Sequence, residues 1–259
     1  MLMFTPAEVA ENVIGIGKAK AGNKAYKLFL LGIMAGMFIA LAAAGANTAM
    51  STVENPSLAK LVSALIFPAG LTMVLLAGSE LFTGNNLIIV SVLTGDVKVS
   101  AMLKNWLIVY LGNFVGSVFI ALLANLSGQT GLFGGALLET TMKIATTKAS
   151  LDFGKAILLG IGCNFLVCIA VWISFSAKSV GGKLAGLYLP TMLFVLCGFE
   201  HSVANMYYVP AGIIAGADVT WGAFFVNNLI PVTIGNIIGG AVLVGVMYWA
   251  IYLADKKKK

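Results

Sequence analysis

The chain has 259 residues, of which 59% are hydrophobic and only 10% are charged. This apolar content exceeds what one water-soluble core can bury, so the composition excludes a soluble globular enzyme. All 16 basic residues are lysine, the formal net charge is +6, and no basic stretch has the interleaved aromatic residues that nucleic-acid binding needs. Because about 20 apolar residues cross a bilayer as a helix, this length predicts roughly six crossings in one membrane domain.

The N-terminal segment, residues 1–27, is predicted to be an amphipathic helix at the cytoplasmic membrane interface. Thr5 and Glu8 have the spacing of a capping box, and Pro6 suits the first turn of a helix. Apolar side chains then recur on one face, which is typical of a helix that lies on a membrane.

The apolar stretches that follow have uneven lengths, in the order 28–53, 61–95, 105–138, 156–177, 184–217 and 219–254. The second and fifth stretches are interrupted near their middle by acidic residues. Each is too long for one straight span and too short for two, which predicts one crossing made of two half-helices. We therefore expect a first repeat at 28–138, an extracytoplasmic connection at 139–155, a second repeat at 156–254 and a cytoplasmic lysine tail at 255–259.

Six crossings place both termini on one side, and the lysine distribution indicates which side. Twelve of the 16 lysines fall on the side of the termini, and four, Lys60, Lys143, Lys148 and Lys155, fall on the other. Because cytoplasmic loops carry an excess of basic residues, this predicts a multi-pass inner-membrane protein with both termini in the cytoplasm.

Two short motifs recur in the same order along the chain. Residues 78–85 and 198–205 share Gly-x-Glu-x-x-x-x-Asn, 120 residues apart, and residues 112–116 and 235–239 share Gly-Asn-x-x-Gly, 123 residues apart. Each half then holds three crossings, so the second half enters the membrane from the opposite side. Broken helices at matching positions of two inverted halves indicate a substrate path near the midplane of the bilayer.

Three ionisable side chains, Glu80, Glu200 and His201, lie inside the predicted spans, leaving aside tyrosine and cysteine. Such groups are costly in a membrane, and they serve function or satisfy a structural partner. Each glutamate is expected to cap the half-helix that follows its loop by accepting backbone N–H bonds. His201, the only histidine in the sequence, is either a buried group bonded to a carbonyl or a gate residue that donates a hydrogen bond to a passing anion.

The half-helices also predict the charge of the passenger. The N-terminus of each second half-helix has a positive dipole end and free N–H groups, which favour a small monovalent anion over a cation. Thr83 is expected to face His201 and to donate or accept a hydrogen bond through its hydroxyl. Phe82 and Phe194 are candidates for an apolar constriction, with ordinary packing as the alternative.

The segments at 78–85, 198–206 and 228–236 closely resemble the signatures of the formate/nitrite transporter family. The resemblance spans essentially the whole chain. It implies an all-α, aquaporin-like protomer of six transmembrane helices in two inverted three-helix repeats with two broken helices. It also implies a homopentamer in the lipid bilayer, with a separate anion pore through each subunit.

The resemblance further implies roles for individual residues. His201 would be the central pore histidine and Thr83 its partner. The residues at the constrictions would be Phe67, Leu71, Leu81, Phe82, Val167 and Phe194. The remaining pore and loop residues would be Lys148, Asn164, Glu200, Glu80, Asn85 and Asn205.

Within this family the chain most resembles the hydrosulfide channels, and formate or nitrite are the other expected passengers. Either a passive channel or a proton-coupled transporter fits these residues. An aquaporin-like neutral-solute channel is disfavoured because no Asn-Pro-Ala tripeptide occurs. An intramembrane enzyme is disfavoured because one histidine and scattered cysteines supply no nucleophile with a base, so neither a cofactor nor a metal is expected.

Overall fold

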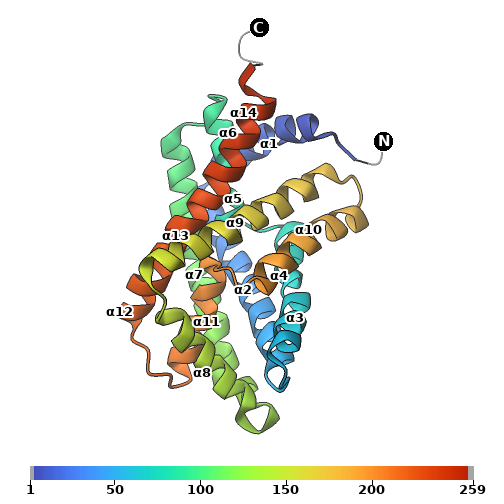
Figure 1. The fold of residues 1–259 in the computed structure, drawn as a ribbon. Helices are drawn as coiled ribbons and strands as arrows, with labels where there is room; N and C mark the ends of the chain where they lie inside the picture. Colours follow the sequence, from blue (N-terminus) through green and yellow to red (C-terminus); the bar gives the residue numbers. More distant parts are fainter. Residues whose placement is uncertain (1–2, 256–259) are drawn as a thin grey trace.

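The computed structural model describes residues 3–255, and these residues form a helical bundle. Most helices pack side by side along one direction, and the first and last described residues lie at the same end of the bundle (Figure 1). We refer to the two ends as the α1 end and the α8 end, after α1 (Pro6–Ala21) and α8 (Ala136–Ala149).

The first half contains three crossings, of which the second is broken. Its helices are α2 (Ala25–Met50), α3 (Pro56–Ile66), α4 (Pro68–Met73), the π-helical segment Val74–Gly78, α5 (Phe82–Asn85), α6 (Ile88–Leu93) and α7 (Val99–Leu126). The helical run Pro56–Gly78 ends at the break, and the chain resumes as Phe82–Leu93. The prediction of one crossing made of two half-helices is confirmed.

The second half repeats this order after two short 3₁₀ segments and α8. Its helices are α9 (Phe153–Ser176), α10 (Val180–Leu196), α11 (Ser202–Ile214), α12 (Trp221–Ala223), the π-helical segment Phe224–Leu229, α13 (Ile230–Ile237), the π-helical segment Ile238–Val246 and α14 (Met247–Tyr252). Helices α10 and α11 form the second broken crossing. Helix α2 packs against α7, and α9 packs against α13, so the two halves use matching pairs.

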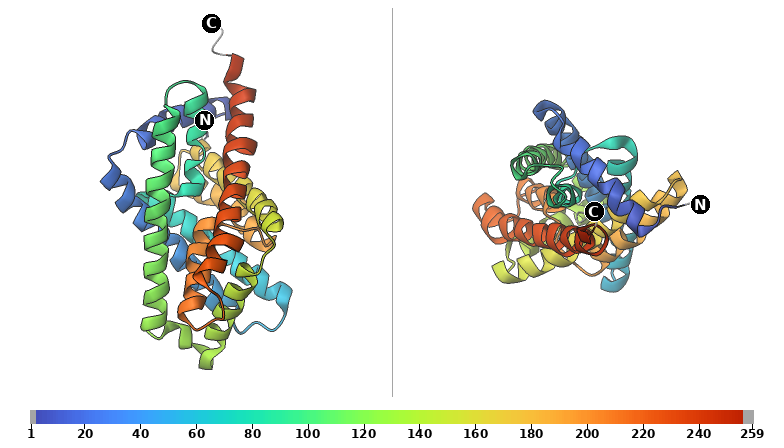
Figure 2. Two further views of the ribbon diagram at one scale, coloured as in Figure 1. Left: turned by 90° about the vertical axis from the view of Figure 1, so that its left-hand side faces the viewer. Right: turned by 90° about the horizontal axis from the view of Figure 1, so that it is seen from above.

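Helix α1 lies across the bundle end instead of along the bundle (Figure 2). Its predicted capping box is present: the Thr5 hydroxyl accepts from the Glu8 backbone N–H, and the Glu8 carboxylate accepts from the Thr5 backbone N–H. Val9 and Val13 on its inner face are buried. The helix therefore covers one end of the bundle with its apolar face.

The glycine of the first motif ends the first half-helix of each broken crossing. Gly78 has φ +84° and Gly198 has φ +73°, a left-handed conformation that side-chain-bearing residues rarely adopt. Each glycine turns the chain out of the helix two residues before a glutamate. This explains why the motif begins with glycine.

The glycines of the second motif permit close helix approach. A Cβ at Gly112 would lie 2.6 Å from the Phe29 carbonyl oxygen, and one at Gly235 would collide with the Ile157 carbonyl oxygen. The backbones of α7 and α13 therefore lie against α2 and α9 at matching places. This contact brings the asparagine that follows each glycine within reach of the breaks.

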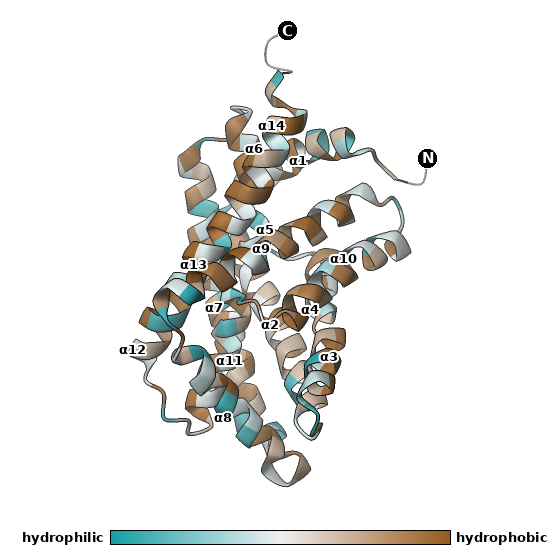
Figure 3. Ribbon diagram, in the orientation of Figure 1, coloured by the Kyte–Doolittle hydropathy of each residue, from teal (hydrophilic) through white to brown (hydrophobic). Residues whose placement is uncertain are grey.

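Hydrophobic residues predominate along most of the helices (Figure 3), and many large apolar side chains are exposed. Leu126, Leu158 and Ile251 are among these exposed side chains. Five helical segments of the described chain are long and apolar enough to span a membrane: Ala25–Met50, Pro56–Gly78, Val99–Leu126, Phe153–Ser176 and Trp221–Tyr252. With the shorter helices of the broken crossings, this is the six-span architecture that the sequence predicts.

The connection between the halves is itself helical. Helix α8 runs from Ala136 to Ala149, so the predicted boundary between residues 138 and 139 falls inside it. Asp152 then caps α9 by accepting from the Lys155 backbone N–H. The consequence is that α8, as a rigid element, holds Lys148 against the bundle.

Candidate functional site

The two chain breaks lie in the interior of the bundle, each held by a backbone hydrogen bond from its glutamate. The Glu80 N–H donates to the Leu31 carbonyl oxygen at 3.2 Å, and the Glu200 N–H donates to the Leu159 carbonyl oxygen at 3.2 Å. The acceptors lie on α2 and α9, the first helix of each half. The two breaks are therefore fixed in equivalent ways.

In the first half, Asn113 of α7 holds the start of the second half-helix. Its Oδ1 accepts from the Phe82 N–H at 3.0 Å, and its Nδ2 donates to the carbonyl oxygens of Gly32 at 2.8 Å and Glu80 at 3.0 Å. The side chain is fully buried. One amide thus satisfies the N–H and the carbonyl oxygen that the break leaves unpaired, and it ties both to α2 through the Gly32 carbonyl oxygen.

In the second half, Asn236 of α13 makes the same three bonds. Its Oδ1 accepts from the Ser202 N–H at 2.9 Å, and its Nδ2 donates to the carbonyl oxygens of Gly160 and Glu200, both at 2.9 Å. The repeated Gly-Asn-x-x-Gly motif therefore encodes a close helix contact and an amide that supports the break.

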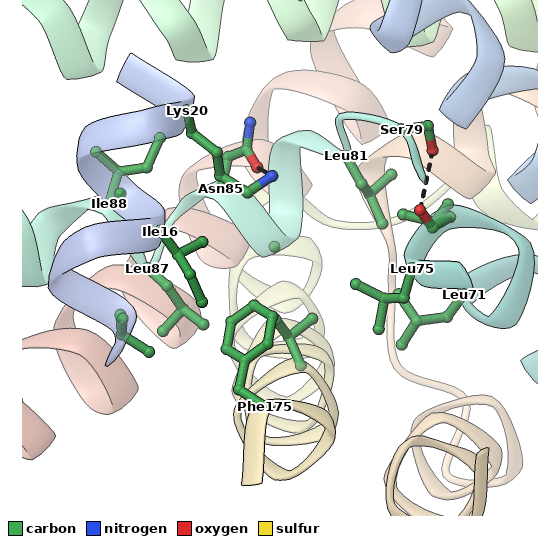
Figure 4. A pocket seen from close by; sticks show the side chains of 15 residues that line it. Ile16, Lys20, Leu71, Leu75, Ser79, Leu81, Asn85, Leu87, Ile88 and Phe175 are labelled. Carbon is green, nitrogen blue, oxygen red and sulfur yellow. Dashed lines mark hydrogen bonds between the residues drawn. The ribbon is translucent and has the colours of Figure 1, made fainter. Parts of the chain in front are cut away.

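The Glu80 carboxylate faces the α1 end and is paired there. Its Oε2 accepts from Asn85 Nδ2 at 2.7 Å and from Lys20 Nζ at 2.8 Å. Lys20 also donates to Asn85 Oδ1 at 2.9 Å, and Figure 4 shows these two side chains together. Asn105 Oδ1 accepts a further bond from Asn85 at 2.8 Å.

The Glu200 carboxylate faces the α8 end and has matching partners. Lys148 Nζ donates to its two oxygens at 2.8 and 2.9 Å, and Asn205 Nδ2 donates at 2.6 Å. Asn228 Oδ1 accepts from Asn205 at 2.7 Å. The first motif therefore encodes a glutamate that accepts from its own asparagine and from one lysine. Lys20 also donates to Asn85, whereas among the described residues the Lys148 ammonium group donates to Glu200 alone.

The expectation that the glutamates cap the half-helices is wrong. The N–H groups of Phe82 and Ser202 are taken by the two asparagines of the second motif, and His201 Nδ1 accepts from the Ala204 N–H at 3.0 Å. Since these donors are already occupied, the carboxylates pair with lysine instead. The first turn of α11 accordingly does not offer the Ser202 and Ala204 N–H groups to an anion.

His201 and Thr83 meet between the two breaks. Thr83 Oγ1 lies 2.9 Å from His201 Nε2, and both side chains are buried. Because Nδ1 accepts a backbone N–H, the ring proton of the neutral imidazole is on Nε2 and points at the threonine oxygen. The Thr83 hydroxyl proton then remains available for a third group.

Asn164 of α9 joins the two halves behind this pair. Its Nδ2 lies within hydrogen-bonding distance of the Thr83 carbonyl oxygen at 3.2 Å, Asn86 Oδ1 at 3.0 Å and the Asn236 carbonyl oxygen at 2.7 Å. The side chain is fully buried. It therefore positions the Thr83 loop against α13.

A cavity of about 620 Å³ opens toward the α8 end, and we call it the α8-side cavity. Phe67, Phe194 and His201 are among the residues that line it, together with the Lys148 and Glu200 pair. The rings of Phe67 and Phe194 meet edge to face at 5.5 Å, and Phe194 stacks on the His201 ring at 5.8 Å. The aromatic pair therefore lies next to the central imidazole.

A second cavity, of about 40 Å³, lies beneath α1, and we call it the α1-side cavity (Figure 4). Leu71, Leu81, Lys20 and Asn85 are among its lining residues. Helix α1 supplies part of its wall and covers this cavity from the α1 end.

Two predicted constriction residues lie in the wall of neither cavity. Phe82 packs edge to face against Tyr110 at 4.8 Å and Trp106 at 6.1 Å, both on α7. Val167 is buried on α9. In this conformation both contribute to packing around the central pair.

Sequence reasoning missed several members of the two clusters. Lys20 was considered only as one of the lysines that mark the side of the termini. Asn113 and Asn236 were recognised as part of a repeated motif, but no role was predicted for them. Asn105 and Asn228 had no assignment, although they lie 123 residues apart, the spacing of the second motif. That shared spacing is the signal that would have found them.

Comparison with known proteins agrees with this architecture. A family model for the formate/nitrite transporter matches residues 7–250. The uncharacterized transporter YrhG of Bacillus subtilis (strain 168) is 42% identical over 264 residues, covering 100% of this chain and 98% of that protein. The formate channel FocA of Haemophilus influenzae is 40% identical over 263 residues, covering 94% of this chain and 93% of that protein.

A solved structure described as a pentameric formate channel with formate bound is also similar. It has a TM-score of 0.79 and 39% sequence identity, and the match covers 88% of this chain and 98% of that one. The similarity extends over nearly the full length in both sequence and fold. The chain belongs to the formate/nitrite transporter family.

Proposed function

We propose that this chain forms a channel for small monovalent anions, with one pore through each subunit of a homopentamer. The observation that carries the proposal is the hydrogen bond between Thr83 and His201, which joins the two chain breaks beside the α8-side cavity. A buried hydroxyl and imidazole at this place supply polar contacts where a spanning path is otherwise apolar. The pentamer is supported by the similar pentameric formate channel.

Formate is the first passenger to test, because the FocA relative is named a formate channel. The sequence favoured hydrosulfide, and nitrite is the third candidate. All three are small conjugate bases of weak acids, so one pore chemistry serves them.

The aromatic pair of Phe67 and Phe194 raises the free energy of an anion that passes it, because the pair is apolar. Moving a bare anion into a medium of dielectric constant near 4 costs on the order of 20 kcal/mol before relaxation. Lys148 is neutralised by Glu200, and the His201 ring is neutral in its hydrogen-bonded state. Hydrogen bonds from Thr83 and His201 must therefore recover part of this cost, or a proton must accompany the anion.

The lysine distribution supports a cytoplasmic α1 end, with the α8-side cavity facing outward in the inner membrane. Both ends of the described chain lie at the α1 end (Figure 1). Protease digestion of sealed, inside-out vesicles should remove tags from both termini, and protection of either tag would contradict this topology.

Flux through proteoliposomes tests the function directly. We expect the purified protein to pass formate, nitrite or hydrosulfide faster than empty liposomes do, and to exclude gluconate as a larger anion. Competition among the three ions ranks them. Osmotic water flux without anion flux would instead support a neutral-solute channel and overturn the proposal.

Replacement of Thr83 tests the central pair. Thr83→Val removes the hydroxyl and should lower anion flux about tenfold, because a hydrogen bond to a charged group contributes about 1.5–3 kcal/mol. Thr191→Val is the matched control, since Thr191 is buried but its hydroxyl bonds to the Leu187 carbonyl of its own helix. Equal flux in the two variants would contradict the role of Thr83.

A further inference from the structure

The hairpin of α2 and α3 forms one wall of the α8-side cavity and carries polar groups that the central site does not use. Asn47, Lys60 and Ser63 line the cavity on this wall. Asn47 is three residues before the end of α2 at Met50, and Lys60 is four residues after the start of α3 at Pro56. In an antiparallel hairpin these positions lie at about the same depth.

The Asn47 amide is buried without a partner. The residue is 1% exposed, and neither Nδ2 nor Oδ1 has a hydrogen-bond partner anywhere in residues 3–255. Leaving a buried polar group unpaired costs about 1–3 kcal/mol, and such groups in native proteins call for an explanation. Because Asn47 lines the adjoining cavity, a molecule bound there would supply the missing partner.

Lys60 is the cation of this wall. It is half-buried, and its ammonium group takes part in none of the ion pairs or side-chain hydrogen bonds found within residues 3–255. Lys148, in the same cavity, has its charge taken up by Glu200. The ammonium group of Lys60 is therefore available to an anion in the cavity.

Ser63 connects this cation to the aromatic pair. Lys60, Ser63 and Phe67 are three and then four residues apart, so they share one face of α3. The Phe67 N–H donates to the Ser63 carbonyl oxygen at 3.2 Å, which continues the helix to the ring. The three side chains form one stripe along the cavity, with Phe67 nearest the central site.

We propose that Asn47, Lys60 and Ser63 form a binding site for a small oxyanion, such as formate or nitrite, in front of the Phe67 and Phe194 pair. The proposal rests on the proposed channel function. The ammonium group supplies the charge, and the amide N–H and the hydroxyl donate to the two oxygens of the anion. Sulfur is a weak hydrogen-bond acceptor, so this site selects oxyanions over hydrosulfide before the ions reach the pair of Phe67 and Phe194.

Concentration-dependent influx tests the site. Initial rates of formate influx into proteoliposomes should give a half-saturating concentration about threefold to tenfold higher for Lys60→Gln and for Asn47→Leu than for the wild type. The maximal rate should be unchanged, because both side chains lie on the cavity side of the Phe67 and Phe194 pair, away from the central site. Lys60→Arg keeps the charge and should stay near the wild-type value.

Two controls make the result specific. Lys143 also lines the cavity but is exposed, so Lys143→Gln should leave the half-saturating concentration of formate near that of the wild type. Asn47→Leu should leave hydrosulfide influx unchanged and should not lower the melting temperature, because the amide has no partner in the protein to lose.

The outcomes separate the site from the channel function. A wild-type protein that conducts small anions, together with unchanged half-saturating concentrations in Lys60→Gln and Asn47→Leu, overturns the site alone. A wild-type protein that conducts none of the three anions overturns the channel function and the site with it. An equal rise in Lys143→Gln overturns the site in favour of a diffuse charge effect.

Discussion

The two chain breaks share one scaffold but carry different chemistry at the centre. In each, a buried glutamate and a buried asparagine pair with a partly exposed lysine, and an asparagine from a neighbouring helix holds the start of the next half-helix. At the spacing of 120 residues, however, His201 corresponds to Leu81, and Thr83 corresponds to Val203. The repeat therefore provides a symmetric frame, and each loop contributes one polar group to an asymmetric pair.

The cavities on the two sides differ as well. The α8-side cavity measures about 620 Å³ and the α1-side cavity about 40 Å³. The lysine of one cluster is on α8, beside a wide opening, whereas the other is on α1, which covers its own cavity. The same lysine–glutamate pair thus lies beside a large cavity in one half and beside a small one in the other. Matching substitutions in the two halves can therefore separate the effect of the pair from the effect of its surroundings.

The largest expected effect comes from replacing Asn113 and Asn236, the asparagines that hold the start of the second half-helix in each half. Asn113→Leu and Asn236→Leu each leave one backbone N–H and one backbone carbonyl oxygen of a break unpaired and should lower the free energy of unfolding by about 3 kcal/mol. Asn47→Leu is the matched control, since this buried amide has no partner. Unfolding titrations in detergent measure all three. A loss under about 1 kcal/mol for either frame variant would contradict an equivalent role in the two halves.

Replacing the lysines should have a smaller effect that differs between the sides. Lys148→Met leaves Glu200 without its cation and should cost about 2 kcal/mol of unfolding free energy, against about 1 kcal/mol for Lys20→Met. The Lys148 side chain is 16% exposed and contacts both carboxylate oxygens, whereas Lys20 is 25% exposed and contacts one. Combining each change with glutamine at the partner glutamate should restore part of the loss. A larger loss at Lys20 would reverse the comparison.

The smallest expected effect concerns the cap of α1. The Thr5 backbone N–H, which donates to the Glu8 carboxylate, holds the Glu8 pKa below its usual value of 4.5. The cap therefore stabilises α1 above that value, and its contribution is lost as the pH falls through the lowered pKa. Hydrogen exchange in α1, corrected for intrinsic rates, should accelerate between pH 6 and about pH 3 more in the wild type than in Glu8→Gln. Equal acceleration would show that the cap does not hold the helix.

Local signals in the sequence predicted the elements that depend on neighbouring residues. The Thr5 and Glu8 cap, the two broken crossings and the inverted repeat all follow from spacing along the chain, and the structure confirms them. The family resemblance is confirmed by the comparisons. The contact of Thr83 with His201 was expected because the two loops of an inverted repeat meet near the midplane of the bilayer.

Contacts that depend on side chains reaching between helices were not predictable in this way. The sequence contains no local sign that Lys20 pairs with Glu80 or that Asn113 and Asn236 take the N–H groups expected to face the glutamates. Their geometry depends on how closely α7 and α13 approach their partners, which is decided by packing. The helical form of the connection around Lys148 was missed because its side chains lack a long apolar run.

The backbone bond to His201 Nδ1 limits how protons can move through the centre. An imidazole serves as a proton wire by accepting on one ring nitrogen and releasing from the other. Here Nδ1 is occupied by the Ala204 N–H, and only Nε2 faces Thr83. A proton exchanged with a passing acid must arrive at and leave from Nε2. The imidazole can therefore bind and release a proton, but only at this one nitrogen. Through-ring transfer would first require the helix α11 to give up its cap.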